Sequence, residues 1–330
     1  MTHYRYNGRP TKLTSVVILA TLILSAGCQP APPTPTPTLA PDAQFFNERG
    51  LECADKGDYD CAIVNYNQAI RLKPDWAEVY DNRGLAYAAQ RDYARAMADW
   101  NQAIKLQPGY MDAYLNRGVA YYNQADYEHA IADYNQAILL SPANAEALYL
   151  RGRAYSDQGS YDRAITDFDQ AARLAPNNAP IYTARGIAHR RKGEWDLAIA
   201  DYARAIQLKP NDAESYFNRG NAYADKGDLD RAMADYDQAL KLKPNLANAY
   251  VNRGIAYTNK GDYDRAIADF DQAIKLQPDQ AEAYYNRGLA YFKRKDNLKA
   301  AVDLKRALEL SHDPELTKRI DETLNSLGAK

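Results

Sequence analysis

The chain has 330 residues, of which 46% are hydrophobic and 25% charged, proportions that are ordinary for a globular protein. Its formal net charge is -2, and without residues 1–27, which contain three basic and no acidic side chains, 38 basic and 43 acidic residues remain, a net charge of -5. We therefore expect no nucleic-acid partner, because such partners select for a basic excess. Tyrosine is abundant, with 27 Tyr against 6 Phe, which indicates regular placement.

Residues 1–27 have the pattern of an export signal. Three basic residues precede an apolar run at 13–24, which is too short to span a bilayer as a helix, and small residues then lead directly into Cys28. The run from Leu24 to Cys28 resembles the lipobox of bacterial lipoproteins. The resemblance implies a signal peptide at 1–27, lipid attachment at Cys28, and an exported protein of the cell membrane or outer membrane with its folded part outside the cytoplasm. Ordinary cleavage beside an unmodified thiol is the alternative.

Residues 28–42 form the predicted tether between this anchor and the folded part. Positions 29–42 contain six prolines and no aromatic residue, so they cannot form a core. We expect an extended, polyproline-like segment.

From residue 43 onward the sequence repeats every 34 residues. The repeated glycines are Gly50, Gly84, Gly118, Gly152, Gly186, Gly220, Gly254 and Gly288, and the repeated prolines are Pro74, Pro108, Pro142, Pro176, Pro210, Pro244 and Pro278. A fixed period of this length is typical of one supersecondary unit copied in tandem.

Each unit predicts two helices. In residues 247–280, apolar and small residues recur at helical spacing before and after the turn at Lys260-Gly261-Asp262, and Pro278 ends the second helix. Glycine within the first helix costs about 1 kcal/mol relative to alanine. We therefore expect it to allow close helix packing, with each glycine facing the alanine that recurs in the second helix, such as Ala266.

These positions resemble the tetratricopeptide repeat, shown in the third unit by Tyr114, Gly118, Tyr121, Ala130 and Tyr134. The resemblance implies an all-α, right-handed superhelical solenoid with first helices on its concave face. The eight predicted units are 43–76, 77–110, 111–144, 145–178, 179–212, 213–246, 247–280 and 281–314. Residues 315–330 should form a capping helix, with Leu316, Ile320, Leu324 and Leu327 on one face.

An arginine precedes each repeated glycine, and an aspartate, or Asn65 in the first unit, lies in the second helix at a constant offset. We interpret these residues as a ladder of structural ion pairs rather than an anion site. Cys53 and Cys61 lie on the two predicted helices of the first unit. An oxidising compartment favours a disulfide between them, whereas the polar residues equivalent to Cys61 in other units favour an outward-facing site, so both readings remain open.

The sequence contains no pattern that indicates catalysis. Its four histidines lack metal-ligand spacing, and neither a phosphate loop nor a nucleophile elbow occurs. We expect no enzyme activity, metal, cofactor or small-molecule substrate. The prediction is a scaffold or adaptor that binds a protein or peptide, an acidic one if the basic residues of the fifth unit take part. A structural or self-assembling component of an envelope complex is the alternative.

The candidate binding residues vary between units and, by family correspondence, face the groove. They are Asn123, Tyr149, Arg153, Arg190, Arg191, Phe217, Asn221, Tyr285 and Phe292. We expect Arg153, Arg190 and Arg191 to lie within reach of one another, although a solvated helix end would also account for the basic residues of the fifth unit. In the family, a carboxylate clamp of Lys and Asn residues binds the C-terminus of a peptide. This sequence matches the asparagine position of the clamp at Asn221 but lacks its lysine.

Overall fold

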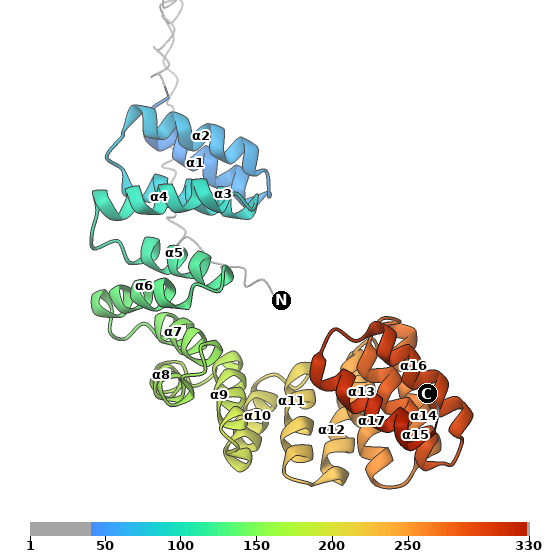
Figure 1. Cartoon of the computed structure of the whole chain (residues 1–330). Coiled ribbons are helices and arrows are strands. Elements are labelled where there is room, and N and C mark those ends of the chain that lie inside the picture. The colour runs from blue at the N-terminus through green and yellow to red at the C-terminus, as the bar shows by residue number, and fades with distance from the viewer. Residues whose placement is uncertain (1–40, 329–330) are drawn as a thin grey trace, which may run out of the picture. The chain divides into compact units, whose positions relative to one another are not determined.

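The computed structural model describes residues 41–328, so the predicted signal peptide, Cys28 and most of the tether lie outside the described residues. The described part contains seventeen helices joined by short turns and no strand (Figure 1). Sixteen of them form consecutive pairs. The first helices are α1 (Ala43–Asp55), α3 (Ala77–Ala89), α5 (Met111–Asn123), α7 (Ala145–Asp157), α9 (Ala179–Arg191), α11 (Ala213–Asp225), α13 (Ala247–Asn259) and α15 (Ala281–Lys293). The second helices are α2 (Tyr59–Leu72), α4 (Tyr93–Leu106), α6 (Tyr127–Leu140), α8 (Tyr161–Leu174), α10 (Trp195–Leu208), α12 (Leu229–Leu242), α14 (Tyr263–Leu276) and α16 (Asn297–Leu310).

The turn inside each pair requires one residue with a positive φ. Glycine supplies it in five repeats, for example Gly261 with a φ of 81°, whereas Arg91, Ala125 and Lys295 occupy this position with φ between 60° and 68°. The next residue is usually aspartate, and its carboxylate accepts a hydrogen bond from the third amide of the second helix, as Asp262 does from Arg265. Turn and cap together fix where each second helix begins.

The repeated glycine allows close packing, but its predicted partner is wrong. A β-carbon placed on Gly186 would lie 2.8 Å from Cε1 of Tyr202, and the other repeated glycines face the equivalent aromatic residue, or Leu304 in the eighth repeat. Among the three atoms nearest to such a β-carbon, the alanine of the second helix contributes its backbone oxygen at Gly220 and Gly288 and no atom at the other repeated glycines. The aromatic ring therefore lies directly on the glycine of the first helix.

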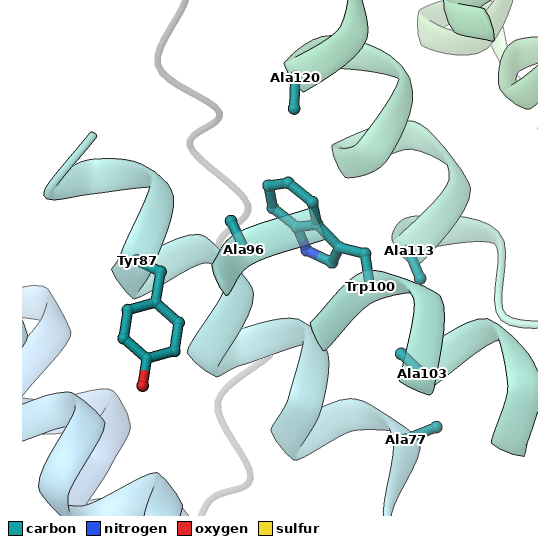
Figure 2. Packing of buried hydrophobic residues seen from close by; sticks show 7 residues of the cluster. All are labelled: Ala77, Tyr87, Ala96, Trp100, Ala103, Ala113 and Ala120. Carbon is teal, nitrogen blue, oxygen red and sulfur yellow. The ribbon is translucent and has the colours of Figure 1, made fainter. Parts of the chain in front are cut away.

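Small residues surround these rings and complete the core. In the second repeat, Trp100 is 2% exposed and lies among Ala96, Ala113 and Ala120 (Figure 2). Ala113 and Ala120 belong to α5 of the next repeat, so each ring fills space within its own pair and against the following pair. Burial of this kind joins the repeats into one continuous core.

Successive first helices also contact one another, from α1 and α3 to α13 and α15. Successive second helices make no comparable contact within residues 42–328. The stack therefore curves locally with its first helices on the inner side. We call the surface formed by α1, α3, α5, α7, α9, α11, α13 and α15 the first-helix face.

Helix α17 (Pro314–Ser326) closes the last repeat, as the spacing of its apolar residues predicts. Ile320 and Leu324 are buried against Leu304 and Tyr285. Gly328, with a φ of 65°, follows the end of the helix.

Candidate partner-binding surface

The arginine ladder is structural in seven repeats. Arg83 donates from Nε and Nη2 to the two carboxylate oxygens of Asp99, at 2.8 and 2.6 Å. The equivalent pairs are Arg117–Asp133, Arg151–Asp167, Arg185–Asp201, Arg219–Asp235, Arg253–Asp269 and Arg287–Asp303. All seven carboxylates are buried. Because each guanidinium already has a bidentate partner, the ladder does not form an anion site.

Most ladder arginines also reach the preceding repeat, a link that the sequence pattern did not reveal. Nη1 of Arg83 donates to Asn67 at 2.5 Å, and Nη1 of Arg185 donates to Asp169 at 2.7 Å. Arg219 makes no such bond within the described residues, because Ala203 occupies the equivalent position. The arginines thus hold neighbouring pairs together as well as the two helices of one pair.

The first repeat departs from the predicted ladder. Arg49 is exposed, and Asn65 donates instead to the backbone oxygen of Cys61 at 2.8 Å. Asn65 carries no charge, so this repeat lacks the acid that holds the other arginines.

The first repeat is also closed by a disulfide between Cys53 and Cys61, whose α-carbons lie 5.7 Å apart. In most other repeats the same two positions hold an aromatic residue and a cation in contact. Arg231 lies 4.7 Å from the ring centre of Tyr223, and the Tyr87–Arg95, Tyr257–Arg265 and Tyr291–Lys299 pairs are equivalent. The cysteine pair therefore replaces a recurring contact at the corner between first and second helix.

The three predicted arginines differ in their surroundings. Arg190 forms an ion pair with Asp225, with Nε 2.6 Å from the carboxylate. Arg153 stacks on Tyr122 at 4.7 Å from the ring centre and donates from Nη2 to its hydroxyl at 2.9 Å. Arg191 is exposed and has no ion-pair or hydrogen-bond partner within residues 41–328. Of the three arginines, Arg190 is therefore paired with an acid, whereas Arg153 and Arg191 have no acidic partner within the described residues.

Two other predicted binding residues are interior. Tyr285 is 5% exposed, because α17 covers it and Arg319 lies 4.9 Å from its ring centre. Asn221 is 8% exposed and accepts hydrogen bonds from Tyr236 and Asn252. Neither side chain is free for a partner in this arrangement.

The remaining predicted residues stay near the surface. Asn123 is exposed, whereas Tyr149, Phe217 and Phe292 are half-buried. The rings of Tyr149 and Phe217 each pack at a tilt against a core ring, that of Phe168 at 6.1 Å and that of Tyr236 at 6.0 Å between centres.

Sequence reasoning missed a polar group on the first-helix face around Tyr122. Its hydroxyl accepts from Arg153 and donates to Asp157 of the next repeat. Burial, followed by the bond to Asp157, raises the pKa of Tyr122 to about 12. The sequence could have indicated this group, because Tyr122 occupies a repeat position at which other repeats have alanine, namely Ala54, Ala88 and Ala224.

A second missed residue is Asp81, a carboxylate that is 3% exposed. Asn116 donates to it at 2.9 Å and the hydroxyl of Tyr110 at 3.3 Å, but no cation contacts it within the described residues. Burial raises its pKa to about 7, with a smaller contribution from the charge of Asp112. The same repeat position holds apolar residues such as Leu115 and Val251 in other repeats, so an acid at this position could have been noticed in the sequence.

None of the helices described between residues 41 and 328 is both long enough and apolar enough to cross a membrane. In the same part of the chain, no group of histidine, cysteine and acidic side chains is arranged to hold a metal ion.

Comparisons with known proteins agree with the repeat geometry. A family model described as TPR repeat matches residues 50–91, 87–125, 186–227, 220–261 and 256–295, and two described as tetratricopeptide repeat match residues 115–179 and 281–314. The chain belongs to the tetratricopeptide repeat (TPR) family. No curated protein matches the sequence.

Solved TPR structures have the same fold. A tetratricopeptide repeat protein from Parabacteroides merdae is 25% identical, with a TM-score of 0.59 over 75% of this chain and 98% of that one. The APC/C hetero-tetramer Cut9-Hcn1 matches with a TM-score of 0.58 and 20% identity, over 84% of this chain and 55% of that one. Yeast Tom70 matches with a TM-score of 0.53 and 20% identity, over 90% of this chain and 66% of that one. The last two show the fold alone.

A TPR array is a scaffold for interactions between proteins, and in this one the repeated positions serve packing. The residues that distinguish one repeat from another on the first-helix face are therefore the candidates for recognition.

Proposed function

We propose that this TPR protein is a non-catalytic adaptor, held at a membrane of the cell envelope through Cys28, that binds a protein or peptide on its first-helix face. The observation that carries the proposal is that repeated and variable residues occupy different places in each repeat. The stack is packed by residues that recur, namely the glycine, the aromatic residue, the alanine and the arginine ladder. The first-helix face carries side chains that differ between repeats.

Support for the anchor comes from the sequence before the folded part. The basic, apolar and small residues at 1–27 end directly at Cys28, and the proline-rich segment follows. A lipid at Cys28 would hold the repeats at a membrane without a spanning helix.

Two measurements test the two halves of the proposal. Cys28→Ser should abolish labelling by a fatty-acid analogue and move the protein from the membrane to the soluble or unprocessed fraction. Unchanged labelling and fractionation would refute the anchor.

The binding half is tested by photo-crosslinking in intact cells from an unnatural amino acid at Asn123, an exposed position of the first-helix face. We expect a discrete crosslinked product that contains a second protein. The matched control places the same group at Glu128, which is exposed on second helix α6. Equal crosslinking from both positions, or products that contain only copies of this chain, would contradict the proposal.

A further inference from the structure

The first-helix face of the third and fourth repeats contains two carboxylates that the fold leaves without partners. Asp112 in α5 and Glu146 in α7 are half-buried, and no cation or hydrogen-bond donor contacts either of them within the described residues. Burial raises the pKa of both groups, and the charge of Asp112 raises that of Glu146 further. Their ionised forms are therefore held at a cost to stability.

Acids in the first turn of a helix are common, because they interact favourably with the helix dipole. That explanation suffices for Glu78, Glu214 and Glu282, which occupy the same position in other repeats and are exposed to solvent. It does not explain why Asp112 and Glu146 are partly desolvated in adjacent repeats.

A cation without an acid lies on the same face. Arg153 follows Glu146 by two helical turns in α7, and it has no ion-pair partner within residues 41–328. The rings of Tyr122 and Tyr149 lie 4.7 and 5.8 Å from its guanidinium carbon, and one amino group donates to Tyr122. The nearby acid, Asp157, accepts from Tyr122 instead. The guanidinium is thus held in place with donors left over.

Helix register places these charges on one surface. Glu146 and Arg153 are seven residues apart in α7 and therefore lie on the same side of the helix, and Asp112 occupies the position in α5 that is equivalent to Glu146. A cation and two carboxylates therefore lie on the same stretch of the first-helix face.

We propose that this stretch binds an extended peptide segment that carries one basic and one acidic side chain. Asp112 and Glu146 take a basic side chain, and Arg153 takes a carboxylate. The inference rests on the proposed function, since it specifies which peptide the first-helix face binds.

The spacing defines the segment further. Glu146 and Arg153 are separated by about 10 Å along the helix axis, at about 1.5 Å per residue. A peptide in the extended polyproline II conformation has three residues per turn and rises about 3.1 Å per residue, so side chains three positions apart point to the same side, about 9 Å apart. The preferred segment therefore carries Lys or Arg and, three positions away, Asp or Glu.

The test is selection of a random peptide library on the purified whole chain. We expect enriched peptides to carry a basic and an acidic residue three positions apart. Selection on Arg153→Gln should lose the acidic preference alone, and selection on the double variant Asp112→Asn, Glu146→Gln should lose the basic preference alone. Arg231→Gln and Glu128→Gln, on second helices, are the matched controls and should leave both preferences intact.

Affinity for one selected synthetic peptide gives a second readout. Arg153→Gln should weaken binding about tenfold, as expected for loss of one charge-assisted hydrogen bond. The double acid variant should melt no lower than the unchanged protein, which separates loss of binding from loss of folding.

The outcomes distinguish this inference from the proposed function. The inference would be overturned if the enriched peptides lacked the charge pair. It would also be overturned if peptides selected on the Arg153 variant and on the double acid variant still carried both charges. Either result would leave the adaptor role standing. A library from which the chain enriches nothing would overturn both.

Discussion

The contact between glycine and ring in the fifth repeat gives a quantitative test of how the stack is held. A β-carbon on Gly186 would lie 2.8, 3.0 and 3.1 Å from Cε1, Cδ1 and Cζ of Tyr202. Carbon atoms in favourable contact are about 3.5–4.0 Å apart, so the ring or the helix would have to move by roughly 0.5–1 Å. Because Tyr202 is 0% exposed, it has no free space to move into.

We expect Gly186→Ala to lower the free energy of unfolding by about 2 kcal/mol. Overpacking of a rigid, enclosed ring costs about 3 kcal/mol, the upper end of the usual range, and the better helix propensity of alanine returns about 1 kcal/mol. Gly288→Ala is the matched control. Its β-carbon would meet Leu304 at the longer distances of 3.0 and 3.3 Å. Leu304 is also 0% exposed, but its side chain can change its torsion angles whereas a ring is rigid, so the loss should be smaller than at Gly186.

The assay is urea denaturation of the whole chain followed by far-UV circular dichroism. Adding Tyr202→Leu to Gly186→Ala gives the same Ala–Leu combination as the Gly288→Ala control and should cost at least 1 kcal/mol less than the sum of the single changes. Additive effects, or equal losses at Gly186 and Gly288, would refute the reasoning that the ring sets the helix spacing.

Three further predictions concern the acid, the turn and the disulfide. The folded pKa of Asp81, about 7 against 3.8, means that its contribution to stability is fully present below about pH 4 and is lost as the pH rises through 7. Asp81→Asn should therefore flatten the pH dependence of melting and stabilise the chain by up to about 4 kcal/mol above pH 8; an unchanged profile would contradict this assignment. Ala125→Gly should raise stability by about 1 kcal/mol in urea denaturation, since φ is 60° there, and a loss would show that the turn is unstrained. Replacing both Cys53 and Cys61 with Ser should lower the free energy of unfolding by about 2 kcal/mol, because the disulfide closes a short loop. Replacing them with Tyr and Arg should restore part of this loss through the contact seen in other repeats. Equal hydrogen exchange of α1 in the Ser and the Tyr–Arg variants would argue against that contact.

The sequence by itself determined the local architecture. The pattern of turns and apolar residues recurs with the 34-residue period through all eight repeats. The residues that start and end helices, together with the spacing of apolar residues, then suffice to place the helices, α17 included. The Arg–Asp ladder was predictable for the same reason, since both partners lie in one repeat at a constant offset.

Only the tertiary structure decided contacts that depend on which side chains meet across the fold. The glycine faces a ring rather than an alanine because the ring of the second helix extends across the first, which spacing alone does not reveal. Tyr285 is buried because α17 packs on it, and Arg190 is neutralised by an acid of the following repeat. The last two contacts each occur once rather than eight times, so the repeat pattern does not predict them. The charges of Asp112, Glu146 and Arg153 are identified as unpaired only after the other ion pairs have been assigned.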